Sequence, residues 1–172
     1  VISALKVQCC PLPTSVLSNH TGFDSFYFED FTDSMPAYIA EWKKLNLKFD
    51  GICSGFLGSH RQIKIVEDFF KTFKTDENII LVDPVMGDYG KLYSTYTTQT
   101  CTEMKKLVKY ADILTPNLTE ACILTDEEYD EKRDVAFWKE PEEMCQSILT
   151  TGSYAVLPPS IAHKPQMRAG KE

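Results

Sequence analysis

A short, uninterrupted run of apolar residues constrains the fold more than any other feature. Residues Asn78 to Val82 contain Ile-Ile-Leu-Val with no polar alternation. Such a run is typical of a strand that is buried on both faces of a parallel sheet. Asp83 follows it directly, so the predicted strand ends in an acidic loop. Because ligands of open α/β sheets bind beyond the carboxyl ends of strands, this loop is the first candidate for a functional site.

Helical and extended patterns alternate along the rest of the chain. A strand end is expected at residues 16–18 and an extended, hairpin-like insert at 23–31, and Thr32 or Asp33 is expected to cap the helix that follows. We predict further strands at residues 49–54, 112–115 and 154–157, and helices at 35–45, 59–73, 97–111, 117–124 and 141–149. The alternation predicts an α/β fold, with a mostly parallel sheet in a three-layer sandwich of helices, sheet and helices.

Composition narrows the class of protein. The chain has 172 residues, 43% of them hydrophobic, which suits one domain with a real core. A formal net charge of -7 argues against a nucleic-acid partner, and the lysines at 105, 106 and 109 are expected to form a solvated helix face. The sequence shows no apolar run of membrane-spanning length and no signal peptide. We therefore expect a cytoplasmic protein without a membrane partner.

The six cysteines contain no C-x-x-C pair, which argues against a zinc site. Most of them stand among apolar residues. We therefore expect reduced, mostly buried thiols, as in a cytoplasmic protein.

The segment Asp83-Pro84-Val85-Met86-Gly87-Asp88 carries two carboxylates at the end of the best strand. Carboxylates in this position can hold Mg²⁺ and orient a polyphosphate. Gly87 would allow the backbone to approach a ligand closely. The alternative is an ordinary turn, since Pro, Gly and Asp are common loop residues.

The segment Thr115-Pro116-Asn117-Leu118-Thr119-Glu120 follows another predicted strand. Asn117 at the N-cap and Glu120 three residues later resemble a capping box, which is a purely structural role. Glu120 would also stand at a helix N-terminus facing a metal-bound phosphate. The two roles are compatible.

The polar turn Ser18-Asn19-His20-Thr21-Gly22 follows the first extended segment. Its hydroxyl and imidazole groups could bind a small polar ring. The alternative is again a simple turn, because these residue types favour turns.

Four segments together resemble the pyridoxal/pyridoxamine kinase family, in this order and spacing. They are residues 11–22 (Pro-Leu-Pro-Thr-Ser-Val-Leu-Ser-Asn-His-Thr-Gly), 54–59 (Ser-Gly-Phe-Leu-Gly-Ser), 82–88 (Val-Asp-Pro-Val-Met-Gly-Asp) and 115–121 (Thr-Pro-Asn-Leu-Thr-Glu-Ala). The resemblance runs from about residue 5 to about residue 157. Asp-Pro-Val-Met alone is shared with hydroxymethylpyrimidine kinases, whereas the Ser-Asn-His-Thr-Gly turn favours the vitamin B6 kinases.

The resemblance implies a ribokinase-like fold and ATP-dependent phosphorylation of the 5′-hydroxymethyl group of pyridoxal, pyridoxamine or pyridoxine. It implies ATP and Mg²⁺ as cofactors, leaves a monovalent cation open, and implies a homodimer for full-length members. The implied substrate-binding residues are Thr21, His20, Leu17 and Phe56. The implied ATP-binding residues are Asp83, Asn117, Glu120, Asp88 and Tyr93, with Asp83 and Glu120 near the metal.

The sequence departs from the family pattern at both ends. The Gly-Thr-Gly-Asp segment that would supply the anion hole and the catalytic base is not found, and neither is the first strand with its polar loop. We therefore expect a partial ribokinase-like domain over residues 1–157, a divergent, disordered tail over 158–172, and no activity of this chain. The alternatives are a hydroxymethylpyrimidine kinase-like enzyme and a non-catalytic fragment.

Overall fold

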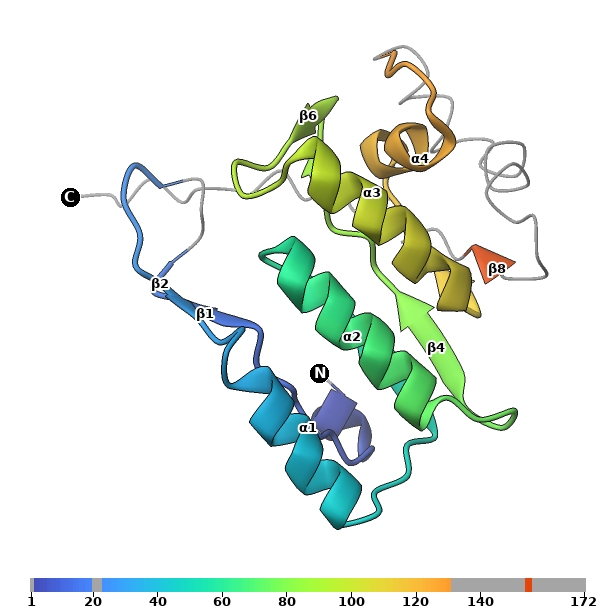
Figure 1. Ribbon diagram of the computed structural model, residues 1–172. Coiled ribbons are helices and arrows are strands. Elements are labelled where there is room, and N and C mark those ends of the chain that lie inside the picture. The colour runs from blue at the N-terminus through green and yellow to red at the C-terminus, as the bar shows by residue number, and fades with distance from the viewer. Residues whose placement is uncertain (1, 20–22, 131–153, 156–172) are drawn as a thin grey trace.

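The computed structural model describes residues 2–19, 23–130 and 154–155, and its centre is a parallel sheet (Figure 1). Four strands lie in the order β3-β4-β7-β8, and every neighbouring pair is parallel. Their bounds are Gly51–Ser54, Ile79–Val82, Ile113–Leu114 and Tyr154–Ala155. The sheet is therefore the parallel one that the sequence predicts.

Among the described residues, helices precede and connect these strands. The helices are η1 (Ile2–Leu5), α1 (Met35–Lys44), α2 (His60–Phe73), α3 (Thr98–Leu107), η2 (Val108–Tyr110) and α4 (Leu118–Thr125). Helix α2 joins β3 to β4, and α3 joins β4 to β7. Since crossovers between parallel strands are right-handed, these two helices lie on one face of the sheet. Figure 1 shows both in front of β4, and they pack against each other.

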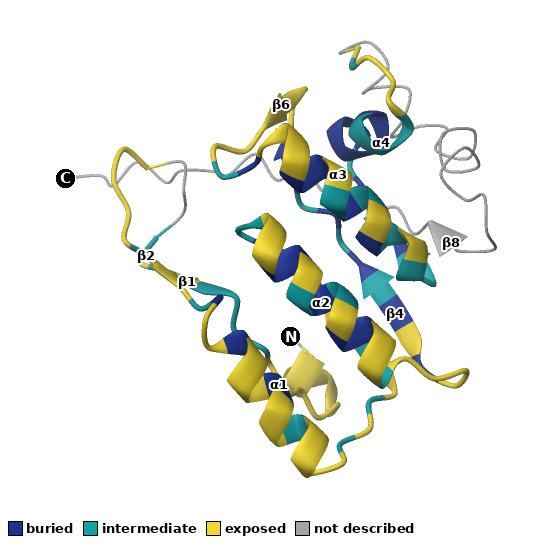
Figure 2. Ribbon diagram, viewed as in Figure 1, coloured by how far each residue is buried: buried dark blue, intermediate teal, exposed yellow. Residues whose placement is uncertain are grey.

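The core lies between this helical layer and the sheet. Phe70, Met104 and Leu107 are fully buried from the helix side, and Ile80 and Val82 from the strand side. The buried stripes on α2 and α3 are visible in Figure 2. Buried apolar residues of α2 at positions 63, 66 and 70 recur at the spacing of an amphipathic helix.

Strand β4 is not buried on both faces, contrary to the prediction from its apolar run. Ile80 and Val82 are 0% exposed, but Ile79 is 53% exposed. Successive side chains of a strand point to opposite faces, and among the described residues only the face toward α2 and α3 is fully covered. Of the three layers expected, these residues supply the sheet and one helical layer.

The cysteines are only partly as expected. Cys101 and Cys122 are buried, whereas Cys9, Cys10 and Cys53 are exposed. Cys53 follows the same rule as Ile79, because it alternates with the buried Ser54 in β3. Cys145 lies outside the described residues.

Two antiparallel hairpins extend from this framework. In the first, β1 (Ser15–Leu17) pairs with β2 (Phe28–Asp30), so the predicted strand end and part of the predicted insert form one hairpin together. The second, β5 (Gly87–Asp88) with β6 (Lys91–Leu92), falls where the sequence analysis places a loop. Its two-residue turn has positive φ at Tyr89 (50°) and Gly90 (73°), as two-residue hairpin turns commonly require.

Helices α2 and α3 begin where the sequence predicts, and side chains cap both of them. The side chains of Ser59 and Thr97 accept hydrogen bonds from the first turns of α2 and α3. The prediction for α1 is wrong, because Ser34 occupies its N-cap. The hydroxyl of Thr32 instead donates to Asp30 at 2.5 Å. Three predicted features lie outside the described residues. They are the helix at 141–149, most of the charged segment at 126–139 and the tail at 158–172.

A buried glutamine fastens the first hairpin to the core. Gln62 is 0% exposed. Its amide nitrogen donates to the Thr14 carbonyl oxygen (2.7 Å), to Asp30 (3.0 Å) and to Thr32 (3.0 Å). Its amide oxygen accepts from the Gly58 backbone amide at 2.8 Å. The segment that enters the hairpin and the segment that leaves it are therefore both held by this side chain.

We predict that Gln62→Leu destabilises the chain by about 3 kcal/mol, because several buried polar groups would lose their partner. Urea denaturation measures this change, and the exposed Gln99→Leu in α3 is the matched control. Equal midpoints for the two variants would contradict the role of Gln62.

Candidate functional site

Polar and aromatic side chains gather beyond the carboxyl ends of three adjacent parallel strands. Phe56 follows β3, Asp83 follows β4 and Asn117 follows β7. Neighbouring parallel strands end at one edge of a sheet, so these residues lie on a common edge. His20 and Thr21, the other expected substrate contacts, lie outside the described residues.

Asp83 is a half-buried acid with one side-chain partner. The side chain of Thr115, at the end of the next strand, hydrogen-bonds to its carboxylate, which favours the charged form. Burial outweighs this contact and raises the pKa of Asp83 above its usual value. The carboxylate therefore retains free lone pairs in a site where a cation would be strongly favoured.

Glu120 is far more deeply buried, with 3% of its surface exposed. One carboxylate oxygen accepts from the Asn117 amide at 2.8 Å and the other from the Met86 amide at 3.1 Å. The Gly87 amide adds a further favourable contact. Burial nevertheless raises the pKa of Glu120 to about 8, and the nearby charge of Asp83 adds to the increase.

Asn117 joins two elements. Its side-chain oxygen accepts from the Glu120 amide at 3.0 Å, which completes the predicted capping box. Its side-chain nitrogen donates to the Gly87 carbonyl oxygen at 2.8 Å. The side chain therefore caps α4 and also holds the loop that follows β4.

Asp88 and Tyr93 lie on the hairpin at the rim of the site. Asp88 is exposed and accepts from the Tyr89 amide at 2.9 Å. Tyr93 is 39% exposed. Partial burial raises the pKa of its phenol, and the charges of Asp88, Glu120 and Asp83 add to this effect. All three acids are therefore near one phenol.

Gly87 has a structural role in the hairpin that the sequence analysis did not predict. A Cβ atom at this position would lie 2.2 Å from the carbonyl oxygen of Lys91, on the opposite strand of the hairpin. Close approach of the two strands therefore requires glycine here, whether or not a ligand is bound.

The aromatic side of the site combines β3 with the first hairpin. Phe56 is half-buried, and its carbonyl oxygen accepts from the Thr14 hydroxyl at 3.1 Å. Leu17 pairs in register with Phe28. A Cβ on Gly58 would lie 3.3 Å from the ring of Phe28 and 3.6 Å from that of Phe56. The two rings therefore approach the same point.

The structure adds residues that the sequence analysis did not single out. Tyr96 is 6% exposed, and its ring centroid lies 6.5 Å from that of Phe56. The nearby Ser54 hydroxyl is buried and has no hydrogen-bond partner among the described residues. Burial raises the pKa of Tyr96, with contributions from Glu120 and Asp83. Tyr96 thus connects the aromatic side of the site to the acidic side, a link that no local pattern indicates.

The two acids differ in how well they suit a metal ion. Asp83 has one side-chain partner, whereas three backbone amides already occupy the carboxylate of Glu120. Within the described ranges, no group of three or more His, Cys, Asp or Glu side chains is arranged to hold a metal. Asp83 is therefore the better direct ligand, and other ligands would have to come from a bound nucleotide or water.

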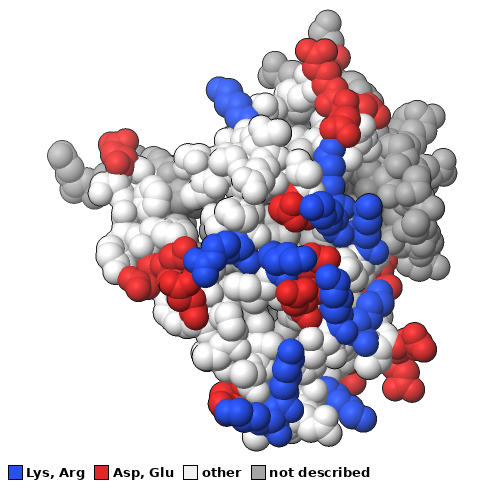
Figure 3. Space-filling view, viewed as in Figure 1, with Lys and Arg blue, Asp and Glu red and all other residues white. Residues whose placement is uncertain are grey.

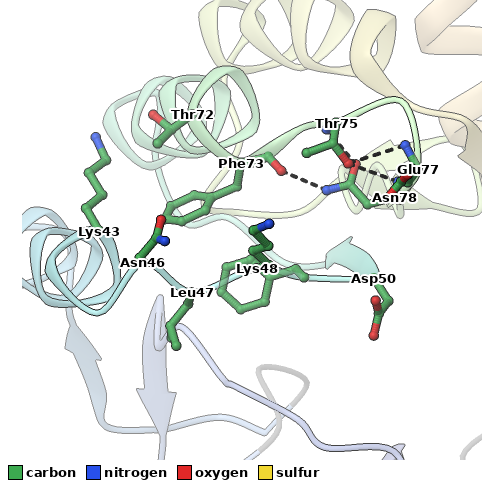
Figure 4. A pocket seen from close by; sticks show the side chains of 11 residues that line it. Lys43, Asn46, Leu47, Lys48, Asp50, Thr72, Phe73, Thr75, Glu77 and Asn78 are labelled. Carbon is green, nitrogen blue, oxygen red and sulfur yellow. Dashed lines mark hydrogen bonds between the residues drawn. The ribbon is translucent and has the colours of Figure 1, made fainter.

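A cavity of about 380 Å³ lies away from this site, beside the amino ends of β3 and β4 (Figure 4). Phe49 and Phe73 line it together with lysine and polar side chains. The amide of Asn78 is already engaged there, by the Phe73 carbonyl oxygen at 2.7 Å and the Thr75 amide at 3.0 Å. Asp83 and Glu120 lie at the opposite, carboxyl edge of the sheet and do not line this cavity.

Basic and acidic side chains are interspersed on the face seen in Figure 3. Lys105 pairs with Asp126 at 2.5 Å, and Lys106 pairs with Glu103 at 2.7 Å. Two of the three lysines predicted to form a solvated helix face are thus paired with acidic side chains. None of the described helices is both long and apolar enough to cross a bilayer.

The fold and the site together define a ribokinase-like α/β protein, with acids at the carboxyl edge of a parallel sheet. The family profile described as phosphomethylpyrimidine kinase matches residues 2–162. The chain therefore belongs to this family.

Relatives of known structure support the assignment. A Bacteroides thetaiotaomicron protein assigned to the phosphomethylpyrimidine kinases, in a crystal form with pyridoxal, is 44% identical with a TM-score of 0.79. The match covers 91% of this chain and 55% of that one. Pyridoxal kinase from Lactobacillus plantarum is 28% identical with a TM-score of 0.78, at the same coverage of 91% and 55%.

Among curated proteins, pyridoxal kinase of Arabidopsis thaliana is 30% identical over 155 residues, which cover 88% of this chain and 48% of the relative. Across four such relatives, the chain spans between 34% and 48% of their length.

The buried carboxyl of Glu120 should make stability depend on pH. Its pKa rises from 4.5 to about 8 on folding, so the folded state binds a proton that the unfolded state releases between these values. The free energy of unfolding should therefore fall as pH rises from 5 to 8, by at most about 1.4 kcal/mol per pH unit. Glu120→Gln should flatten this dependence while Gln preserves the capping box.

Urea denaturation at pH 5, 6, 7 and 8 measures this dependence. The exposed Glu77→Gln, which changes charge equally, serves as the control and should behave as the wild type. An unchanged pH slope in Glu120→Gln would show that Glu120 is not the group responsible.

Proposed function

We propose that this chain provides the substrate and metal–nucleotide binding parts of an ATP-dependent kinase acting on the 5′-hydroxymethyl group of pyridoxal, pyridoxamine or pyridoxine. The observation that carries the proposal is that Asp83 and Glu120 follow two neighbouring parallel strands, β4 and β7, at the carboxyl edge of the sheet. Phosphoryl transfer depends mainly on positioning and on electrostatic stabilisation of the phosphates, and acids at such an edge can hold the required cation.

The two acids would divide the work. Asp83, with free lone pairs, would hold Mg²⁺ on the phosphates of ATP. Glu120 would act through the elements it holds and through water, because backbone amides occupy its oxygens. Asn117, Asp88 and Tyr93 would contact the nucleotide from the adjoining loop and helix. When bound, Mg²⁺ would neutralise charge on the transferring phosphoryl group.

The aromatic side of the site would bind the substrate ring. Phe56 would lie against the pyridine ring and Leu17 would form an apolar wall, while His20 and Thr21 would contact its polar groups. The relative crystallised with pyridoxal supports this choice of substrate, as does the pyridoxal kinase from Lactobacillus plantarum. A monovalent cation and a homodimer extend the proposal by family resemblance, and a cytoplasmic location extends it from the sequence composition.

A hydroxymethylpyrimidine kinase is the second candidate, because the matching family profile carries that description. Both substrates are planar nitrogen heterocycles with a hydroxymethyl group, so the acids do not discriminate between them. Binding experiments that compare pyridoxal directly with hydroxymethylpyrimidine do discriminate between the two candidates. Tighter binding of pyridoxal would favour the first candidate, and tighter binding of the pyrimidine would favour the second.

We predict that Asp83→Asn weakens binding of ADP in the presence of Mg²⁺ by roughly tenfold or more, because a charged metal ligand is lost. Binding without Mg²⁺ should change little. Isothermal titration calorimetry with and without Mg²⁺ gives both values.

Asp76→Asn, an exposed acid in the loop before β4, is the matched control and should bind as the wild type does. Equal Mg²⁺ dependence in Asp83→Asn and wild type would refute the metal role of Asp83. An absence of any nucleotide binding by the wild type would refute the proposed function itself.

A further inference from the structure

Three side chains at the start of α4 each make a hydrogen bond to the loop after β4. Asn117 donates to the Gly87 carbonyl oxygen at 2.8 Å, and Glu120 accepts from the Met86 amide at 3.1 Å. The third contact is made by Thr119, whose hydroxyl accepts from the Gly90 amide at 2.9 Å. Between them, the three side chains bind both the base and the tip of the β5–β6 hairpin.

Thr119 differs from its two neighbours in this turn. Asn117 and Glu120 also complete the capping box of their own helix, so each would be needed there without any hairpin. Thr119 is 3% exposed, and the amide that donates to its hydroxyl belongs to Gly90, 29 residues away in the hairpin turn. A buried hydroxyl is costly without a partner, so its position is explained by the contact with Gly90.

The hairpin tip is shaped to receive this contact. Gly90 has φ of +73°, a conformation that side chains other than glycine rarely adopt. A Cβ here would lie 2.5 Å from the ring of Tyr129, which packs on the buried residues of α4. The tip is therefore held between Thr119 and Tyr129, while Tyr89 and Gly90 themselves stay exposed to solvent.

We propose that Thr119 is a positioning residue: its hydroxyl fixes the tip of the β5–β6 hairpin and thereby sets the placement of Asp88 and Tyr93 at the rim of the site. The proposal rests on the proposed function, because these two residues matter only if a nucleotide binds beside them. Thr119 does not reach the ligand itself. It acts through the Gly90 amide, so its loss affects the nucleotide side of the site and leaves the Phe56 side unchanged.

Thr119→Val tests this proposal, because valine keeps the shape and removes the acceptor. Amide hydrogen exchange at Gly90 should accelerate roughly tenfold, as expected for loss of one hydrogen bond. Calorimetry should show the dissociation constant of Mg²⁺–ADP rising roughly three- to tenfold and that of pyridoxal unchanged. Thr119→Ser, which keeps the hydroxyl, should restore both Gly90 protection and nucleotide binding.

Thr125→Val is the matched control, since this α4 hydroxyl bonds to the Ala121 carbonyl oxygen of its own helix at 2.9 Å. It should leave Gly90 exchange and nucleotide binding unchanged. A thermal melt checks folding, and Thr119→Ala replaces the valine variant if that variant does not fold.

Unchanged Gly90 exchange in Thr119→Val, or a serine variant that behaves like valine, would overturn the positioning role. Equal weakening of ADP and pyridoxal binding would also overturn it, because a general structural defect affects both. If the wild type binds no nucleotide, the proposed function fails, and Gly90 exchange still decides whether Thr119 fixes the hairpin.

Discussion

The carboxylate of Glu120 is the interaction on which the site depends. A buried carboxylate is costly unless hydrogen bonds compensate for the lost water, and here amides from two separate segments do so. Met86 belongs to the loop after β4, and Asn117 to the start of α4. The need to satisfy one buried acid therefore brings the ends of two neighbouring strands into a fixed arrangement.

This arrangement also sets the electrostatics of the edge. Asp83 lies close enough to raise the pKa of Glu120, and both acids raise the pKa of Tyr93. Burial raises the pKa of Asp83 as well. Asp83 and Glu120 thus share a region of the protein in which the charged form of a carboxyl group is disfavoured. A cation bound there would relieve the repulsion, which links the structural role of Glu120 to the metal-binding role proposed for Asp83.

The comparisons place this edge in a family context. The fold is ribokinase-like, and relatives named as pyridoxal kinases match most of the chain, which spans about half of the length of the Lactobacillus plantarum enzyme. The exposed Ile79 and Cys53 show that the described residues cover one face of the sheet more fully than the other. Sequence and fold therefore assign the chain to the same family.

Local sequence determined the framework. The apolar run before Asp83, the stripe on α2 and the capping box at Asn117 each depend on neighbours within a few residues, so their periods and spacings are legible in the chain. Only the tertiary structure decided that Ile79 is exposed, that Gln62 fastens the first hairpin, and that Thr119 and Tyr96 adjoin the site. These features arise from contacts between segments distant in sequence, and the patterns that reveal helices and strands carry no information about which distant groups will meet.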